Sequence, residues 1–242
     1  LEIHHDGDLP ARTGLGSSSS FSVGMLHTLF ALKGIMPTRQ QLALNAIHLE
    51  RDILKESVGS QDQILAAIGG FNRIDFFNDN TYRETPITIN PERIKELKSH
   101  LMFFFTGISR YSSEIAKKKI ENFPNRKKQL TTMYQMVEEA ITILNSKNTA
   151  IDEFGQLLNE SWMLKRNICD NISTSHIDEI YDAARSVGAI GGKILGAGGG
   201  GFMILFAKPE HQSGIKKRLN DLLYVPFDFE HSGSQIILNQ QD

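Results

Sequence analysis

The sequence of 242 residues predicts an α+β protein that is organised as one large domain or two small ones. Three observations lead to this fold class. Several long stretches carry apolar residues at helical spacing, short apolar stretches next to Gly, Pro or Asn have the character of strands, and two glycine-rich segments form turns. A hydrophobic content of 40% and a charged content of 22% are ordinary for a globular chain and allow a sizeable core.

Charge and cysteine usage restrict the partners and the compartment. A net charge of −2 gives no general reason to expect nucleic acid or an anionic membrane as a partner. No apolar run approaches the roughly 20 residues that cross a bilayer, and the first residues do not have the pattern of a signal peptide. The single cysteine, Cys169, rules out an intrachain disulfide and is expected to be a small, at least half-buried residue. We therefore expect a cytoplasmic protein.

The chain begins with a predicted strand and turn over residues 1–8 and then enters a turn rich in Gly and Ser at residues 10–20. Gly14 and Gly16 permit backbone angles that other residues avoid, so the main chain can curl around a ligand. The serines supply hydroxyl and N–H groups where apolar spacing indicates the start of a helix. Such a helix N-terminus is a ready anion site, above all for phosphate. The apolar residues of this helix are Phe21, Met25, Leu26, Leu29 and Phe30.

Three other interpretations of this turn are less favourable. A flexible linker would not normally lead directly into an amphipathic helix. A Walker loop needs Lys after its last Gly, and here Ser17 follows Gly16. A dinucleotide loop needs a third Gly three residues after the second, where this chain has Ser19.

A second helix is predicted to follow Thr38, because Thr38 and Gln41 form a capping-box pattern. Glu50 lies beside the apolar stripe of this helix, toward its C-terminal end, and from the residues alone we interpret it as a surface charge near Arg51. The stripe consists of Leu42, Ala46, Leu49 and Ile53.

Asp62 stands between two Gln residues, after the turn at Gly59. The residues alone leave two readings of Asp62 open: a helix cap, or the carboxylate of a catalytic site.

The rest of the chain alternates between predicted strands and helices. The strands are expected at residues 71–77, 85–89, 101–105, 202–207, 225–229 and 235–238, and the helices within residues 130–144, 152–166, 175–188 and up to residue 222. Pro91 is interpreted as the start of a connector, so we place a domain boundary between residues 92 and 93. In the long stripe of residues 130–144, two methionines and a tyrosine at helical spacing indicate core packing.

The second glycine run occupies residues 191–201. Gly196, Gly198 and Gly201 satisfy the spacing of a dinucleotide fingerprint, but that fingerprint must open a helix, and here a strand follows. We predict a glycine turn between two strands instead.

Three stretches resemble the motifs of one family, the GHMP small-molecule kinases. Gly14, Leu15, Gly16, Ser17 and Ser18, with Pro10 before them, are similar to the second motif of that family, Pro-x-x-x-Gly-Leu-Gly-Ser-Ser. Gly59, Asp62 and Gln63 match the Gly-x-x-Asp-Gln pattern of its sugar-1-kinases. The run from Gly196 resembles the third motif, Gly-Ala-Gly-x-Gly-Gly. Residues 58–63, 69–72 and 106–110 are most similar to the D-glycero-D-manno-heptose 7-phosphate kinases, a branch of the family.

This resemblance implies a fold and a reaction. The fold is a two-domain one, with a domain related to ribosomal protein S5 domain 2 over residues 1–92, a ferredoxin-like domain over residues 93–242 and the site between them. The reaction is ATP-dependent phosphorylation of the anomeric hydroxyl of a sugar phosphate, such as D-glycero-D-manno-heptose 7-phosphate. Fucokinase-like or galactokinase-like activity, or a sensor that binds nucleotide and sugar without turnover, remain alternatives. The family usually carries a further N-terminal segment with its first motif, so we expect this chain to be a fragment.

The resemblance also implies the site residues. ATP and Mg²⁺ are the expected cofactors, and a small sugar phosphate is the expected partner; the oligomeric state is left open. Asp62 is the expected catalytic base, and Ser18 and Glu50 are the expected Mg²⁺ ligands. The expected nucleotide-binding residues are Arg12, Gly14, Leu15, Gly16, Ser17, Ser18 and Ser19. The expected substrate-binding residues are Gln61, Arg110, Gly196, Ala197, Gly198 and Gly199.

Overall fold

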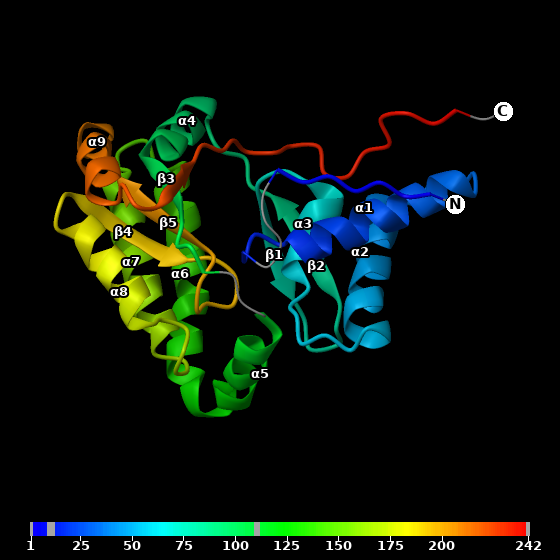
Figure 1. Cartoon of the computed structure of the whole chain (residues 1–242), viewed down its shortest axis with the longest axis horizontal. Coiled ribbons are helices and arrows are strands. Elements are labelled where there is room, and N and C mark those ends of the chain that lie inside the picture. Colours follow the sequence, from blue (N-terminus) through cyan, green and yellow to red (C-terminus); the bar gives the residue numbers. More distant parts are fainter. Residues whose placement is uncertain (1, 9–12, 109–111, 241–242) are drawn as a thin grey trace.

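The computed structural model of the chain describes residues 2–8, 13–108 and 112–240, and it has two units side by side (Figure 1). The first unit combines three α-helices with a short hairpin, and the second combines an antiparallel sheet with the remaining helices, so the predicted α+β class is confirmed. The first unit contains α1 (Ser17–Leu32), α2 (Arg39–His48), the π-helical turn η1 (Leu49–Ile53), α3 (Gln61–Ile68), β1 (Asn72–Phe76) and β2 (Tyr82–Pro86).

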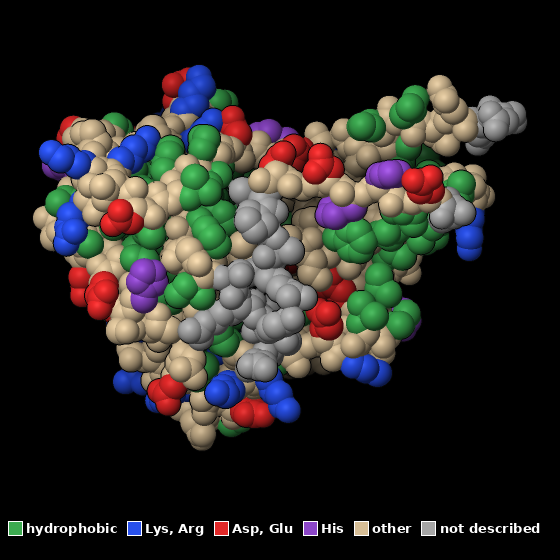
Figure 2. Space-filling model, in the orientation of Figure 1, with side chains coloured by type: hydrophobic (Ala, Val, Ile, Leu, Met, Phe, Trp, Pro, Cys, Tyr) green, Lys and Arg blue, Asp and Glu red, His purple; other side chains and the backbone are tan. Residues whose placement is uncertain are grey.

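The first unit is held together by the inner faces of its helices. Thr38 caps α2 as predicted: the Gln41 N–H donates to Thr38 Oγ1 over 3.1 Å, and the Thr38 N–H donates to Gln41 Oε1 over 3.0 Å. The outer faces leave large apolar side chains in solvent, among them Leu32 and Leu44, and Met36 in the connection between α1 and α2 is 97% exposed. Figure 2 shows hydrophobic side chains gathered over this unit. The buried core consists of Val23, Leu42, Ala43, Ala46, Ile64 and Ala67.

The second unit is built on a four-stranded sheet of order β4-β5-β3-β6, in which every neighbouring pair is antiparallel. Alternate residues of its central strands, Phe104 and Leu205 among them, pack with Trp162 and Tyr181 in the main core. The elements are α4 (Pro91–His100), β3 (Leu101–Phe105), α5 (Ser112–Asn122), η2 (Phe123–Arg126), α6 (Lys127–Asn145), α7 (Asp152–Arg166), α8 (Ser175–Arg185), β4 (Ala189–Ile194), β5 (Phe202–Ala207), α9 (Pro209–Arg218) and β6 (Leu223–Val225).

Some predicted elements are wrong. Residues 2–8 form no strand, and residues 226–238 contain neither of the two strands expected there, because the last strand, β6, ends at Val225. Pro91 does not start a connector but occupies the first turn of α4, where its missing N–H costs nothing, and Asn90 caps that helix. In α6, Tyr134 is 66% exposed while Met136 is buried, so only part of the predicted stripe faces the core.

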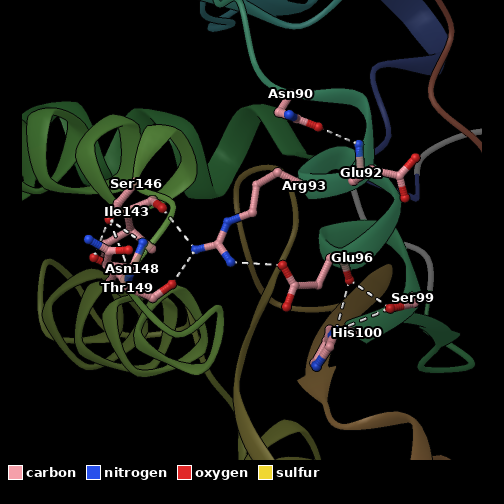
Figure 3. A network of polar contacts seen from close by, with 10 residues as sticks. All are labelled: Asn90, Glu92, Arg93, Glu96, Ser99, His100, Ile143, Ser146, Asn148 and Thr149. Atoms are coloured by element: carbon pink, nitrogen blue, oxygen red, sulfur yellow. Dashed lines mark hydrogen bonds and ion pairs between the residues drawn. The ribbon is translucent and has the colours of Figure 1, made fainter.

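Arg93 fastens helix α4 to the C-terminal end of α6 and to the loop that follows it (Figure 3). The Arg93 Nη2 group donates to the carbonyl oxygens of Ile143 and Thr149 over 2.9 and 2.8 Å, and Nη1 donates to Glu96 over 2.8 Å. A boundary between residues 92 and 93 falls in the first turn of this helix, and its place remains a prediction.

The C-terminal segment after β6 runs from the second unit across the first (Figure 1). Lys98 forms an ion pair of 2.6 Å with Asp228, and farther along the Gly70 N–H donates to the Glu230 carbonyl over 3.0 Å. Isolated contacts of this kind replace a strand ladder, which explains why the segment is extended without being part of a sheet. Within the described ranges, every helix is too short or too polar to span a bilayer.

Candidate active site

The N-terminus of α1 lies at the junction of the two units. Gly16 is the N-cap and adopts a left-handed conformation with φ of 70°. A glycine has no side chain to cap the helix, so the N–H groups of the first turn point outward at the positive end of the helix dipole. This arrangement agrees with the predicted anion-binding turn, in which Ser18 is exposed while Ser19 is buried.

Glu50 is the centre of a buried polar cluster. Its carboxylate is completely buried, which corrects the interpretation of Glu50 as a surface charge. The hydroxyls of Ser19 and Ser22 donate to it over 3.0 and 2.8 Å, the Gln63 amide donates a short hydrogen bond, and the Ser18 hydroxyl is the most distant donor, at 3.4 Å. A carboxylate accepts about four hydrogen bonds, so this cluster satisfies a charge that would otherwise be costly to bury.

A widened helical turn directs Glu50 inward. Residues 49–53 form a π-helical turn at the end of α2, in which the Leu54 N–H donates to the Leu49 carbonyl. An extra residue in the turn rotates the side chains that follow, and such turns occur frequently at functional sites. The regular spacing that we read along this helix therefore could not locate Glu50 correctly.

Asp62 lies in the first turn of α3, directly against the glycine-rich turn that precedes α1. A Cβ atom on Gly16 would lie 3.1 Å from both Cβ and Cγ of Asp62. The side chain is exposed at its edge, yet the surrounding protein desolvates the carboxylate and raises its pKa, and the negative charge of Glu50 raises the pKa further. Ser60 occupies the N-cap of α3, so Asp62 is not the cap of this helix.

The two glycine-rich segments touch each other. A Cβ on Gly196 would lie 2.8 Å from the Cα of Gly14, and a Cβ on Gly201 would lie 2.1 Å from the Thr13 carbonyl oxygen. The Phe202 N–H donates to that same carbonyl over 3.1 Å. As predicted, the second glycine run is a turn between two strands, β4 and β5, which excludes the dinucleotide fingerprint.

The remaining predicted residues have different surroundings. Gln61 is exposed beside Asp62, and Gly196 is exposed beside Gly14. Gly198 and Gly199 are buried, and the Gly199 N–H donates to the Ile172 carbonyl over 2.9 Å, so their backbone faces protein. Leu15 and Ser17 are half-buried in the first turn, and Ala197 packs beside the main core. Arg12 and Arg110 lie outside the described residues.

Sequence reasoning missed two members of the Glu50 cluster. Ser22 is the last Ser of the turn-and-helix stretch, one helical turn after Ser18, and this spacing was the available signal. Gln63 entered only as part of a motif, yet it is completely buried, and its Oε1 atom has no hydrogen-bond partner among the described residues.

The oxygens of Ser18 and Glu50 suit a Mg²⁺ ion. Two neighbouring ligands of an octahedral Mg²⁺ lie about 3.0 Å apart, because each Mg–O distance is about 2.1 Å. The Ser18 hydroxyl and Glu50 Oε1 are separated by 3.4 Å, and their hydrogen bond is the weakest of the cluster. Replacing that bond by a shared ion would leave the other three donors to Glu50 in place.

Comparison with known proteins identifies two family models. Residues 1–70 match the GHMP kinases N terminal domain, and residues 136–225 match the GHMP kinases C terminal model. Together the two models cover more than half of the chain.

Individual relatives agree with these models. A D-glycero-alpha-D-manno-heptose 7-phosphate kinase of Campylobacter jejuni is 32% identical over 227 residues, which are 90% of this chain and 65% of the relative. A bifunctional fucokinase/GDP-fucose pyrophosphorylase of Arabidopsis thaliana is 26% identical over 94% of this chain and 22% of its own length. The chain spans less than two thirds of each relative.

A solved structure shows the same fold. The crystal structure of a D-glycero-D-manno-heptose 1-phosphate kinase from Bacteriodes thetaiotaomicron superposes with a TM-score of 0.71 at 24% identity. The superposition covers 93% of this chain and 64% of that chain. The two-unit arrangement of Figure 1 is therefore an arrangement that a known kinase also adopts.

Proposed function

The chain belongs to the GHMP kinase family, and from this premise we propose that the protein is an ATP-dependent kinase that phosphorylates the anomeric hydroxyl of a sugar phosphate. One observation carries the proposal. The Asp62 carboxylate lies in contact range of Gly16, at the N-terminus of α1, so an acceptor hydroxyl and a nucleotide phosphate would meet there.

In this proposal the turn at residues 14–19 holds the nucleotide. Its backbone N–H groups and the dipole of α1 face the phosphates, and Arg12 precedes the turn in the sequence. Glycine is needed at both positions because each packs closely against another segment of the same chain. Gly14 packs against the segment of Gly196, and Gly16 packs against Asp62. A side chain at Gly14 would fill the space between the two units, and a side chain at Gly16 would crowd Asp62 within the first unit.

Ser18 and Glu50 would hold Mg²⁺, which supplies positive charge against the phosphates. Glu50 contributes the negative charge and one oxygen ligand, while Ser19, Ser22 and Gln63 fix the carboxylate in one orientation. Among the described residues, no three His, Cys, Asp or Glu side chains gather into a metal cage. A site with few protein oxygens is typical of Mg²⁺ that is bound together with nucleotide phosphates.

Asp62 would orient the acceptor hydroxyl and accept its proton as transfer begins. Its raised pKa makes the carboxylate a stronger base than an ordinary surface aspartate. Gln61 and Gly196 are exposed next to Asp62 and Gly14, respectively, and are the substrate-contacting residues that the proposal favours. The sequence leaves Arg110 as a further candidate for binding the substrate. Gly198 and Gly199 are buried and would support the second glycine turn without contacting the substrate.

The acceptor that the proposal favours is D-glycero-D-manno-heptose 7-phosphate. The support is the family membership together with a relative of that name at 32% identity. Fucose is the second candidate, because a fucokinase-containing relative covers 94% of this chain. As part of the same proposal, the protein acts in the reducing cytoplasm, because ATP is present there and Cys169 is a free cysteine.

An ATP-consumption screen with full-length protein tests the function. The acceptors are heptose 7-phosphate, the unphosphorylated heptose, galactose and fucose. We expect the highest kcat/KM with heptose 7-phosphate. A clear preference for fucose or galactose would overturn the substrate, and binding of nucleotide and sugar without ATP consumption would show a sensor in place of a kinase.

A further inference from the structure

Lys165 is a buried cation that the proposed reaction does not use. It lies near the end of α7, and only 7% of the residue is exposed. Its ammonium donates to the carbonyl oxygens of Ile194 and Gly196 over 3.0 and 2.8 Å. These carbonyls belong to the last residue of β4 and to the second glycine turn, which follows that strand. Lys165 therefore joins α7 to the start of the second glycine turn.

The packing of α7 along β4 brings Lys165 to this place (Figure 1). A Cβ on Gly191 would clash with the Gly155 carbonyl oxygen, so the helix and the strand are in close contact at these two residues. From Gly155 to Lys165 the helix advances about 15 Å. From Gly191 to Gly196 an extended chain advances about 16–17 Å. The two elements run the same way from their contact, so the Lys165 side chain ends level with Gly196.

The sheet does not fix the second glycine turn by itself. β4 is an edge strand, and its pairing with β5 reaches the Leu195 N–H, which donates to the Phe202 carbonyl over 2.9 Å. Only alternate residues of an antiparallel strand exchange hydrogen bonds with one neighbour, so the carbonyl of Ile194 faces the outer edge of β4. Gly196 follows with φ of 64° and lies beyond β4. The ammonium of Lys165 takes the place of a neighbouring strand at this edge.

The second glycine turn packs on the glycine-rich turn before α1. A Cβ on Gly196 would lie 2.8 Å from the Gly14 Cα, and a Cβ on Gly14 would lie 2.9 Å from the Leu195 carbonyl oxygen. Contacts this close leave no room for water, so a shift of the second turn would move Gly14 or open a gap beside it. Each link from Lys165 through Gly196 to Gly14 is a direct contact.

An amine is costly to bury at this position. Burial lowers the pKa of Lys165 well below its usual range, and the charges of Lys193 and Lys119 lower it further, so the surroundings oppose the charged form. An apolar side chain of the same length would avoid this cost but would remove the donor to both carbonyls. Lys165 is therefore suited to fixing two carbonyls and contributes poorly to core stability.

We propose that Lys165 is a positioning residue for nucleotide binding. It fixes the second glycine turn, and that turn fixes the phosphate-binding turn at residues 14–19. This inference rests on the proposed function and adds to it a residue that acts through Gly196 and Gly14 without touching nucleotide or sugar. Loss of the ammonium should therefore weaken nucleotide binding.

The test compares full-length wild type with Lys165→Met, which keeps the length of the side chain and removes the ammonium. Titration calorimetry with Mg²⁺ and a non-hydrolysable ATP analogue measures nucleotide binding without turnover. We expect Kd to rise about tenfold, as for loss of a charge-assisted hydrogen bond. If Lys165→Met does not fold, Lys165→Gln keeps N–H donors on a shorter side chain and should raise Kd about threefold. An unchanged Kd in the folded variant would overturn the proposal.

Two variants control for stability and for charge. Tyr181→Phe removes a hydroxyl that donates to Asn159 Oδ1 on α7 over 2.6 Å, so it weakens the packing of the same helix without touching the turn. Lys217→Met removes an exposed cation in the last turn of α9. Both should keep Kd for the analogue within about twofold of wild type. An equal rise of Kd in Tyr181→Phe would mean that affinity follows general stability, which overturns the proposal.

Combination with Gly196→Ala tests the path of contacts. If Lys165 acts through Gly196, the double variant should bind the analogue at most about twofold more weakly than the weaker single variant. Effects that multiply would mean that Lys165 acts on the nucleotide independently of Gly196, and they would overturn the proposal. Hydrogen exchange gives a second readout, since residues 14–19 should exchange faster in Lys165→Met and at the wild-type rate in Tyr181→Phe.

The same titration separates this proposal from the kinase function. If wild type binds the analogue but consumes no ATP with any sugar, the kinase function fails, and the difference in Kd between wild type and Lys165→Met still decides the role of Lys165. If wild type binds no nucleotide, both proposals are overturned.

Discussion

At the scale of single residues, Asp62 is the group whose replacement separates catalysis from structure. Asp62→Asn keeps the shape of the side chain but removes the proton acceptor. We expect kcat to fall by about 10²-fold or more, with little change in nucleotide affinity, because the turn at residues 14–19 binds the phosphates. Steady-state kinetics and a nucleotide titration on one preparation measure both quantities. Near-normal turnover would remove Asp62 from the catalytic role.

The raised pKa of Asp62 also predicts a pH dependence of stability. A carboxyl whose folded-state pKa lies above its unfolded value binds its proton more tightly in the folded protein, so its ionisation costs stability as the pH rises through the folded pKa. Asp62→Asn removes this cost and should melt at the same or a higher temperature than wild type at neutral pH. The two proteins should converge at acid pH, where the carboxyl is protonated in both states. Thermal melts across that pH range check the sign, and a lower melting temperature of the variant at neutral pH would contradict it.

Glu50→Gln tests the buried cluster. Three serines and an amide donate to the carboxylate, so a neutral amide with its own N–H donors leaves several of them unsatisfied. We expect loss of Mg²⁺-dependent turnover together with a fall in the free energy of unfolding of about 2 kcal/mol. The control is Ser22→Ala, which removes one donor to the same carboxylate and should cost about 1 kcal/mol while turnover persists. Wild-type activity of Glu50→Gln at limiting Mg²⁺ would exclude Glu50 as a metal ligand.

At the scale of elements, the contact between the two glycine turns is what places the reacting groups. Gly196 has φ of 64°, and a Cβ there would lie 2.8 Å from the Gly14 Cα. Gly196→Ala should therefore lower the free energy of unfolding by about 1–3 kcal/mol and reduce kcat/KM for both substrates. Gly24→Ala is the control, since a Cβ on Gly24 meets nothing within 4 Å inside α1. That change should stabilise the helix by about 0.5–1 kcal/mol, and equal effects of the two variants would contradict the packing argument.

At the scale of the whole molecule, the C-terminal segment joins the two units. Gly233 has φ of 65°, and a Cβ there would lie 2.6 Å from the Ala67 carbonyl oxygen. Gly233→Ala should displace the segment from α3 and expose the Gly70 N–H, which now donates to Glu230. Faster hydrogen exchange at Gly70, with unchanged exchange in β3 and β5, is the expected result. Gly214→Ala, where a Cβ meets nothing within 4 Å, should leave exchange at Gly70 unchanged.

Local features of the sequence determined several elements correctly. The capping box at Thr38, the strand at Leu101–Phe105 and the helix at Asp152–Arg166 depend on neighbouring residues, and the structure confirms all three. The glycine turn between β4 and β5 was also predictable, since the residues after it have the pattern of a strand. These features are short-range, so the order of residue types is sufficient to specify them.

Tertiary structure alone decided the surroundings of Glu50 and Lys165. A π-helical turn carries Glu50 into the interior, where donors from α1 and α3 surround it, and a helical stripe read at regular spacing places the same residue outside. Lys165 donates to the carbonyl oxygens of Ile194 and Gly196, which lie 29 and 31 residues later in the chain, and it reaches them only because α7 packs against β4. The free energy of a buried charge depends on every group within a few ångströms, and the sequence lists those groups without saying which of them become neighbours.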